Sequence, residues 1–168
     1  MSYSEHCGEA KDIKARCAVV TLSDTRTPGT DTSGRKICDL LKGAGHTIGD
    51  YQVIPDEPRG LQLTLETLVG RRDLDLIVSN GGTGVSRRDR TIPVVQMMLE
   101  IELPGFGELF RMLSWQEIGS GALLSRATGG VAGGKLLFAL PGSTAAVELA
   151  VTRLILPEIG HLLHQLRK

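Results

Sequence analysis

Short apolar runs alternate along the chain with longer segments in which apolar residues recur every three or four positions. Residues 16–22, 47–54 and 74–79 are such short runs, and their β-branched residues favour buried strands. Between the first two runs, the spacing of Ile37 and Leu41 predicts a helix with one buried face. Strands that alternate with helices indicate an α/β protein whose mostly parallel sheet is covered on both sides.

Capping residues and helix breakers set the expected ends of the elements. Thr32 or Ser33 can cap the first helix, and Pro58 fits the first turn of the second. Pro157 must break or kink the helical segment that starts near Ser143. The remaining predicted elements are a helix around 93–100, a turn at 103–107, a helix near 108–118, strands at 128–132 and 135–140 joined as a small β-hairpin at Gly133 and Gly134, and helices at 143–156 and 157–167.

Length and charge limit the classes of function. The 168 residues suffice for one domain with a sizeable core, which we place at 15–168 after a flexible tail at 1–14. Lys plus Arg and Asp plus Glu both number 19, so the net charge gives no reason to expect nucleic acid or an anionic membrane as a partner. The chain shows no apolar run as long as a membrane span and no apolar block of a signal peptide, so we expect a cytoplasmic protein.

Polar or glycine residues follow four of the predicted strands at the point where each strand ends. In a parallel sheet the carboxyl ends of the strands lie at one edge, and ligands bind there. One shared site therefore explains these residues better than four unrelated turns. The four strand ends carry Ser23 and Asp24; Pro55, Asp56 and Glu57; Asn80, Gly81, Gly82, Thr83 and Gly84; and Pro141, Gly142, Ser143 and Thr144.

The glycine loop after the third strand, Gly81 to Gly84, can present consecutive backbone N–H groups to an anion such as phosphate. Arg87, Arg88 and Arg90 strengthen this interpretation, because guanidinium groups match phosphate oxygens. The alternative for the loop is a turn between strand and helix that binds nothing. For Arg87 and Arg90 the alternative is a solvated charged loop.

Two carboxylates, Asp56 and Asp89, are expected at the same edge as the glycine loop. Carboxylates repel phosphate, so their presence makes sense if a divalent cation, most simply Mg2+, bridges carboxylate and phosphate oxygens. Each also has a structural alternative. Asp56 can cap the helix at Pro58, and Asp89 can form a surface salt bridge or help to cap the next helix, for which Thr91 is the more natural cap.

The segment from Pro141 to Ser143 opens a helix and offers a second anion site, although Ser143 can equally be a simple helix cap. Another glycine-rich segment, 129–135 (GGVAGGK), has the spacing of a Walker A loop. We reject that interpretation, because Leu136 stands where a Mg2+-binding Ser or Thr is needed and the segment precedes a strand.

Six segments, in this order, resemble the MoaB/Mog family of molybdenum-cofactor biosynthesis proteins, whose domain also occurs in gephyrin and in CinA proteins. The resemblance covers about residues 15–160, and 104–119 is similar to the MoaB branch in particular. The segments are LSDTRTPGTDTSG (22–34), IPDE (54–57), SNGGTGVSRRDRT (79–91), PGFGELFRMLSWQEIG (104–119), LLSRA (123–127) and LPGSTAAV (140–147).

The resemblance implies a three-layer α/β/α sandwich that assembles as a homotrimer or homohexamer. It also implies binding of molybdopterin, a pterin with a terminal phosphate, which active members adenylylate with Mg2+ and ATP, releasing pyrophosphate. By their positions in the motifs, the resemblance implies that Asp56 and Asp89 are the catalytic and metal-binding carboxylates. The residues expected to bind substrate and nucleotide are Ser23, Asp24, Gly81, Gly82, Thr83, Gly84, Arg88, Pro141, Gly142 and Ser143.

Two features depart from the family pattern. Ala145 stands where the family has Lys, which removes one cationic contact and leaves a non-catalytic molybdopterin carrier or scaffold as the alternative function. Ile92 separates Thr91 from the proline that follows it directly in many relatives. Hydrolysis of a nucleotide pyrophosphate, suggested by the likeness to CinA, ranks last because this chain carries no companion domain like theirs.

The segment 104–119 also bears on assembly. Phe106, Phe110, Met112 and Trp115 give this segment more apolar surface than one helix face can bury. This surface independently predicts a homo-oligomer.

Overall fold

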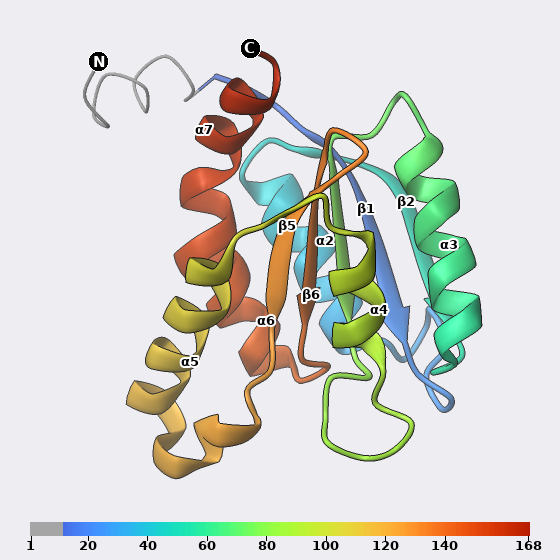
Figure 1. Cartoon of the computed structure of the whole chain (residues 1–168), viewed down its shortest axis with the longest axis vertical. Helices are drawn as coiled ribbons and strands as arrows, with labels where there is room; N and C mark the ends of the chain where they lie inside the picture. Colours follow the sequence, from blue (N-terminus) through green and yellow to red (C-terminus); the bar gives the residue numbers. More distant parts are fainter. Residues whose placement is uncertain (1–11) are drawn as a thin grey trace.

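A six-stranded sheet lies at the centre of the computed structural model, which describes residues 12–168, with the strands in the order β2-β1-β3-β6-β5-β4 (Figure 1). Residues 1–11 of the predicted tail lie outside the described residues. The expected mostly parallel sheet is confirmed. The parallel strands are β1 (Arg16–Leu22), β2 (Thr47–Ile54), β3 (Leu76–Asn80) and β6 (Lys135–Leu140), and the antiparallel ones are β5 (Thr128–Ala132) and β4 (Ile101–Glu102).

Helices cover both faces of this sheet, which confirms the three-layer α/β/α sandwich. Successive strand residues point to opposite faces, so Cys17 and Val19 join one core cluster while Ala18 and Val20 join the other. The first cluster is covered by α2 (Thr32–Gly43), α5 (Pro104–Ile118), α6 (Thr144–Ala150) and α7 (Leu156–Leu166), and the second by α3 (Pro58–Gly70) and α4 (Thr91–Met98). None of the helices in residues 12–168 is both long and apolar enough to cross a bilayer.

Helix α5 begins at Pro104, earlier than the predicted start near 108. Proline is well tolerated in the first turn of a helix, where its missing N–H needs no partner. The earlier start lets Phe106 and Phe110 share one helix face and enter the core. There, the ring centroids of Phe106 and Phe138 are 4.7 Å apart. A short 3-10 helix, η1 (Gly119–Leu124), follows.

Pro157 changes the C-terminal helix without interrupting it. The structure has α6, then a π-helical segment, η2 (Val151–Ile155), and then α7, where we expected two helices at 143–156 and 157–167. A proline lacks the N–H that an α-helix needs at that position, and its ring crowds the preceding turn. A wider π turn just before Pro157 accommodates both effects and keeps the chain helical.

The other differences are small. β4 has two residues, too few to show a pattern in the sequence, and it pairs with β5. The third strand is 76–80 instead of 74–79, and α4 is 91–98 instead of 93–100. The predicted hairpin is confirmed: β5 and β6 pair in antiparallel register around Gly133 and Gly134, whose φ angles are +54° and +71°.

Candidate functional site

The four parallel strands end at the same edge of the sheet, as expected. Their register places Leu22 opposite Ile54, and Asn80 opposite Leu140. Loops 23–31, 55–57, 81–90 and 141–143 therefore leave the sheet side by side. We call this edge the candidate site.

The glycine loop requires glycine for two reasons. Gly81 and Gly82 have φ angles of +99° and +62°, which side-chain-bearing residues rarely adopt. A Cβ on Gly81 would also collide with the carbonyl oxygen of Leu22. On the neighbouring loop, a Cβ on Gly142 would lie 3.2 Å from the Cα of Gly81. The bare backbones of two loops thus pack closely at the centre of the site.

Two predicted carboxylates lie directly against this loop. A Cβ on Gly82 would be 2.6 Å from Oδ1 of Asp56, and a Cβ on Gly84 would be 2.7 Å from Oδ2 of Asp89. The two aspartates are close enough for Asp89 to raise the pKa of the Asp56 carboxyl. The structure therefore brings Asp56, Asp89 and the glycine loop together.

The structural alternative for Asp56 is wrong, because Glu57 caps α3. The Glu57 carboxylate accepts hydrogen bonds from the N–H groups of Arg59 at 3.0 Å and Gly60 at 2.6 Å. Burial raises the pKa of the Asp56 carboxyl, as do the charges of Asp89 and Asp24, while Arg88 partly offsets them. Asp56 is thus held among like charges without a capping role.

The environment of Asp89 has the opposite effect. Its Oδ2 accepts a hydrogen bond of 2.8 Å from the Ser86 N–H. Hydrogen bonds from Ser86 lower the pKa of the Asp89 carboxyl, with help from the Gly84 N–H and the charge of Arg126, and they outweigh a smaller effect of burial. Arg90 occupies the N-cap position of α4 and makes no side-chain capping bond, so neither Asp89 nor Thr91 caps that helix.

Asp24, Arg88 and Ser23 shape the rim of the site. Oδ2 of Asp24 pairs with Nη2 of Arg88 at 2.6 Å, and Oδ1 of Asp24 accepts from the Asp56 N–H at 3.1 Å. The Arg88 side chain is 69% exposed, so this pair is weak and can open to a ligand. The Ser23 hydroxyl accepts from the N–H groups of Thr25 and Arg26, which curls the loop after β1.

Behind the rim lies a buried acid to which the sequence analysis gave no role. Asp31 is fully buried and is the N-cap of α2, where we expected Thr32 or Ser33. It accepts hydrogen bonds from the Gly34 N–H at 3.0 Å and the Tyr51 hydroxyl at 2.7 Å. Burial raises the pKa of Asp31, but hydrogen bonds from Thr21, Gly34, Tyr51 and Ser33 outweigh it, so the pKa is lowered.

Arg26 joins this acid to three strand ends. Its Nη1 donates to the Ser33 hydroxyl at 2.6 Å and to the Gly142 carbonyl at 3.2 Å, and it lies 3.5 Å from Oδ1 of Asp31. The Ser33 hydroxyl in turn donates to Oδ1 of Asn80 at 2.8 Å. The network fixes the loops after β1, β3 and β6 relative to one another.

Arg126 is a second arginine to which the sequence analysis assigned no role, and it contacts the glycine loop. Arg126 follows η1, and its Nη1 donates to the Gly84 carbonyl at 2.8 Å. The only sequence signal for Arg126 was its place in the segment LLSRA, which carried no geometric information.

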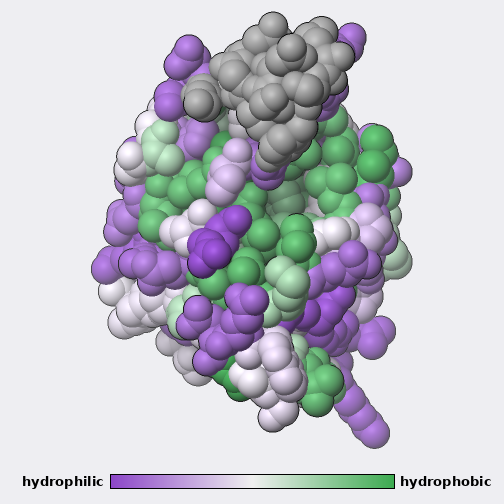
Figure 2. Space-filling view, turned by 90° about the vertical axis from the view of Figure 1, so that its left-hand side faces the viewer, coloured by the Kyte–Doolittle hydropathy of each residue, from purple (hydrophilic) through white to green (hydrophobic). Residues whose placement is uncertain are grey.

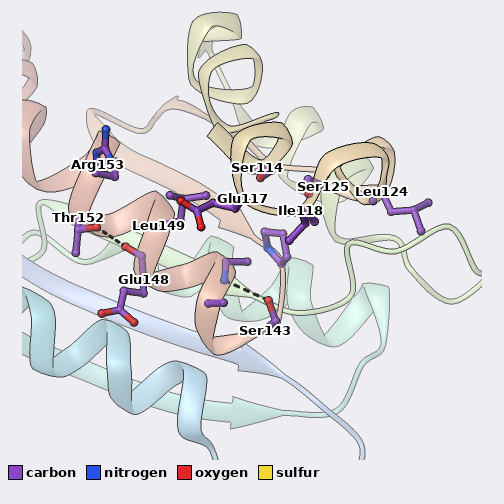
Figure 3. Close-up of a pocket in the computed structure, with 14 residues that line it drawn as sticks. Ser114, Glu117, Ile118, Leu124, Ser125, Ser143, Glu148, Leu149, Thr152 and Arg153 are labelled. Atoms are coloured by element: carbon purple, nitrogen blue, oxygen red, sulfur yellow. Dashed lines mark hydrogen bonds between the residues drawn. The ribbon is translucent and has the colours of Figure 1, made fainter. Parts of the chain in front are cut away.

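Ser143 caps α6 by accepting a hydrogen bond of 3.2 Å from the Ala146 N–H, so its capping alternative is correct. Ser143 also borders a groove of about 590 Å³ (Figure 3). The groove is lined on one side by Ser114, Ile118 and Leu124 from α5 and η1, and on the other by Ala145, Leu149 and Arg153 from α6 and η2. It lies directly beside the loop 141–143.

The residues present fit a divalent cation that arrives with phosphate. Within residues 12–168, no group of three or more His, Cys, Asp or Glu side chains forms a ready-made metal cage. Mg2+ commonly uses one or two carboxylates and completes its shell with phosphate oxygens and water. Asp56 and Asp89 would supply the carboxylates, beside backbone that can bind the phosphate.

Fold and site together define an α/β protein with a glycine loop and two carboxylates beside it at the carboxyl edge of its sheet. The family described as "Probable molybdopterin binding domain" matches residues 18–161. By these residues and by the relatives below, the chain belongs to the MoaB/Mog family of molybdenum-cofactor biosynthesis proteins, within its MoaB branch.

The relatives align over nearly their whole length. "Molybdenum cofactor biosynthesis protein B" of Halalkalibacterium halodurans is 49% identical, covering 100% of this chain and 99% of the relative. A crystal structure of a protein with that name is 47% identical, with a TM-score of 0.90 over 92% of this chain and 97% of its own. The "tungsten cofactor synthesizing protein MoaB" of Pyrococcus furiosus is 33% identical, with a TM-score of 0.84 over 92% of this chain and 98% of its own.

Proposed function

We propose that this protein binds molybdopterin and, with Mg2+, transfers the adenylyl group of ATP to the terminal phosphate of molybdopterin, releasing pyrophosphate. An oxygen of that phosphate forms a bond to the α-phosphorus of ATP, and the bond from this phosphorus to the leaving pyrophosphate oxygen breaks. Such a transfer depends on positioning and charge neutralisation and requires no protein nucleophile. The names of the curated relatives support the pathway.

Each part of the candidate site has a role in this proposal. The N–H groups of the glycine loop and of loop 141–143 bind phosphate oxygens. Asp56 and Asp89 hold Mg2+, which, when bound, neutralises part of the repulsion between the two anionic reactants. Arg88 leaves Asp24 to add positive charge beside them. The groove beside Ser143 has the volume of a small-molecule pocket and receives the organic part of a ligand.

The observation that carries the proposal is the contact of two carboxylates with two bare glycines of one loop. Gly82 lies against Asp56, and Gly84 lies against Asp89. Acidic oxygens beside an anion-binding backbone are repulsive toward phosphate alone and favourable toward phosphate that carries a cation.

The test is incubation of the protein with molybdopterin, Mg2+ and ATP, followed by measurement of pyrophosphate and of adenylylated molybdopterin. Both products are expected in equal amounts, and both are expected to fall by at least about 100-fold in Asp89→Asn. If molybdopterin binds and no pyrophosphate appears, the transferase proposal is wrong.

The second candidate is a carrier that binds molybdopterin without reacting. Ala145, which lines the groove, favours it because alanine brings no positive charge to the loop 141–143. A carrier binds molybdopterin equally well with and without ATP, and its affinity does not change in Asp89→Asn. Calorimetric titration with molybdopterin distinguishes the two functions.

We also propose that the protein is a homo-oligomer, assembled through α5 and η1. Phe106 and Phe110 are buried in the core, whereas Met112 and Trp115 are 50% and 60% exposed. Apolar side chains form a broad band across the molecular face on the side of α5 and α7 (Figure 2). Further exposed apolar side chains on α5 and η1 are Leu109, Ile118, Leu123 and Leu124.

Sedimentation of Trp115→Glu tests this assembly, with Leu63→Glu as a matched control. Leu63 is 55% exposed on α3, which covers the other face of the sheet. Wild type and Leu63→Glu are expected to sediment as one oligomer and Trp115→Glu as a smaller species. A monomeric wild type at micromolar concentration contradicts the proposal.

A further inference from the structure

The first residue of α4 carries a hydroxyl group that has no role in the fold. Thr91 is 1% exposed, and its Oγ1 is the one buried side-chain oxygen or nitrogen in the described part of the chain without a hydrogen-bond partner. The backbone of Thr91 is satisfied, because its N–H donates to the Gly82 carbonyl at 3.1 Å. A buried hydroxyl without a partner destabilises a protein, so an unpaired one beside a proposed ligand site is a candidate contact for that ligand.

The Oγ1 atom of Thr91 lies beside the place that a side chain on Gly82 would occupy. A Cβ on Gly82 would lie 2.5 Å from Oγ1 of Thr91 and 2.6 Å from Oδ1 of Asp56. The two oxygens therefore flank the same point above the glycine backbone. One belongs to α4 and the other to the loop after β2, and only a residue without a side chain leaves the space between them open.

The chemistry of this pair matches a hard cation. A carboxylate and a hydroxyl are both oxygen ligands, and a Ser or Thr hydroxyl on Mg2+ is a recurring partner of nucleotide phosphates. Alternative partners are absent among the described residues, because Thr91 caps no helix and its hydroxyl reaches no carbonyl within hydrogen-bond distance.

We propose that the Thr91 hydroxyl is the third protein oxygen of the divalent-cation site, after Asp56 and Asp89, and that it gains its partner only when the cation arrives with a nucleoside triphosphate. This inference rests on the proposed function of the same site. The inference adds a residue of helix α4 to the loops that contact the ligand. Gly82 then serves two purposes: its backbone binds phosphate, and its missing side chain leaves room for the cation.

The test compares Thr91→Val, which keeps the shape and removes the hydroxyl, with Thr91→Ser, which keeps the hydroxyl. Binding of Mn2+ is measured by electron paramagnetic resonance with α,β-methylene-ATP, which cannot transfer its adenylyl group. Thr91→Val is expected to weaken Mn2+ binding about tenfold, the effect of one lost ligand, and Thr91→Ser to stay within about threefold of wild type.

Melting temperatures without cation or nucleotide provide an independent readout. Because the hydroxyl has no partner in the free protein, Thr91→Val is expected to keep the Tm or raise it by about 2–6 °C. A Tm that falls more in Thr91→Val than in Thr91→Ser shows that the hydroxyl already has a partner and overturns the inference. Equal Mn2+ affinity in wild type and Thr91→Val also overturns it.

Failure of the proposed function gives a different result. If wild type with α,β-methylene-ATP binds no Mn2+, the cation site itself is wrong, and this inference fails with it. If wild type binds Mn2+ and Thr91→Val binds it equally well, only the role of Thr91 is wrong.

Discussion

Asp56 and Asp89 contact the same glycine loop, yet their surroundings move their carboxyl pKa values in opposite directions. Burial and neighbouring acids raise the pKa of Asp56, whereas hydrogen bonds from Ser86 lower that of Asp89. The charged form of the Asp89 carboxyl is therefore stabilised by its surroundings, whereas the charged form of the Asp56 carboxyl is destabilised. A cation bound between the two carboxylates would remove that destabilisation.

Replacing each aspartate by asparagine is expected to change stability with opposite signs. The raised pKa of Asp56 means that the folded state binds its proton more tightly, so the stability from this group is present below pH 3.8 and is lost as the pH rises through the folded pKa. At pH 7 the free energy of unfolding of Asp56→Asn is therefore expected to be higher than that of wild type. The difference is less than about 1 kcal/mol, because the Asp56 carboxyl is half-exposed. Urea denaturation between pH 3 and 8 measures this.

Asp89→Asn is the matched comparison. In wild type, the lowered pKa of the Asp89 carboxyl contributes stability that is present above pH 3.8 and is lost as the pH falls through the folded pKa. Asp89→Asn is therefore expected to be less stable than wild type at pH 7. If both variants shift stability in the same direction at pH 7, the two environments have been misassigned.

Gly82→Ala is expected to abolish nucleotide binding and to lower the free energy of unfolding by about 1–3 kcal/mol, because the φ of +62° is strained for alanine and the methyl group meets Thr91 and Asp56. Gly43→Ala is the control, since a Cβ there meets nothing within 4 Å. This exposed helical position is expected to gain about 0.5–1 kcal/mol. Calorimetry with ATP and thermal unfolding measure both effects.

Arg126→Ala is expected to raise the pKa of Asp89 and to weaken ATP binding about three- to tenfold, because the glycine loop loses the bond from Nη1 to the Gly84 carbonyl. Carbon-13 NMR titration of the aspartate carboxyls reports the pKa, and Arg126→Lys should restore part of it through charge. Arg111→Ala removes an exposed cation from the same neighbourhood and is expected to change neither quantity. An unchanged Asp89 pKa in Arg126→Ala would show that Arg126 does not act on the loop.

Tyr51→Phe is expected to lower the free energy of unfolding by about 1.5–3 kcal/mol at pH 7, because Asp31 loses a hydrogen bond to its charged form. The lowered pKa of Asp31 contributes stability above pH 3.8 that is lost as the pH falls through the folded pKa. The difference between wild type and Tyr51→Phe should therefore shrink in acid. A difference that is constant from pH 7 to pH 3 argues against a role for the carboxylate charge.

The sequence predicted the fold well because its dominant signals are local. Buried β-branched runs and amphipathic spacing located four parallel strands and most helices, and Pro58 marked the start of α3. Capping was harder, because several polar residues compete at each helix start. Glu57 instead of Asp56, and Asp31 instead of Thr32 or Ser33, hold the caps, and only three-dimensional contacts decide between such neighbours.

At the site, the sequence predicted which strand ends meet and which acids face the glycines. It missed Arg26 and Arg126, because each acts on a loop distant in sequence, Arg26 on Gly142 and Arg126 on Gly84. It also predicted Thr91 as a helix cap. That residue type is right for a cap, but the helix begins one residue too early for its hydroxyl to serve the backbone.

The two-residue strand β4 has a consequence for solubility. Ile101 and Glu102 are both exposed and form one end of the sheet. So short an edge offers few free backbone groups to another polypeptide, and the charge of Glu102 further discourages pairing. Fibrous aggregation by extension of the sheet is therefore disfavoured at this end.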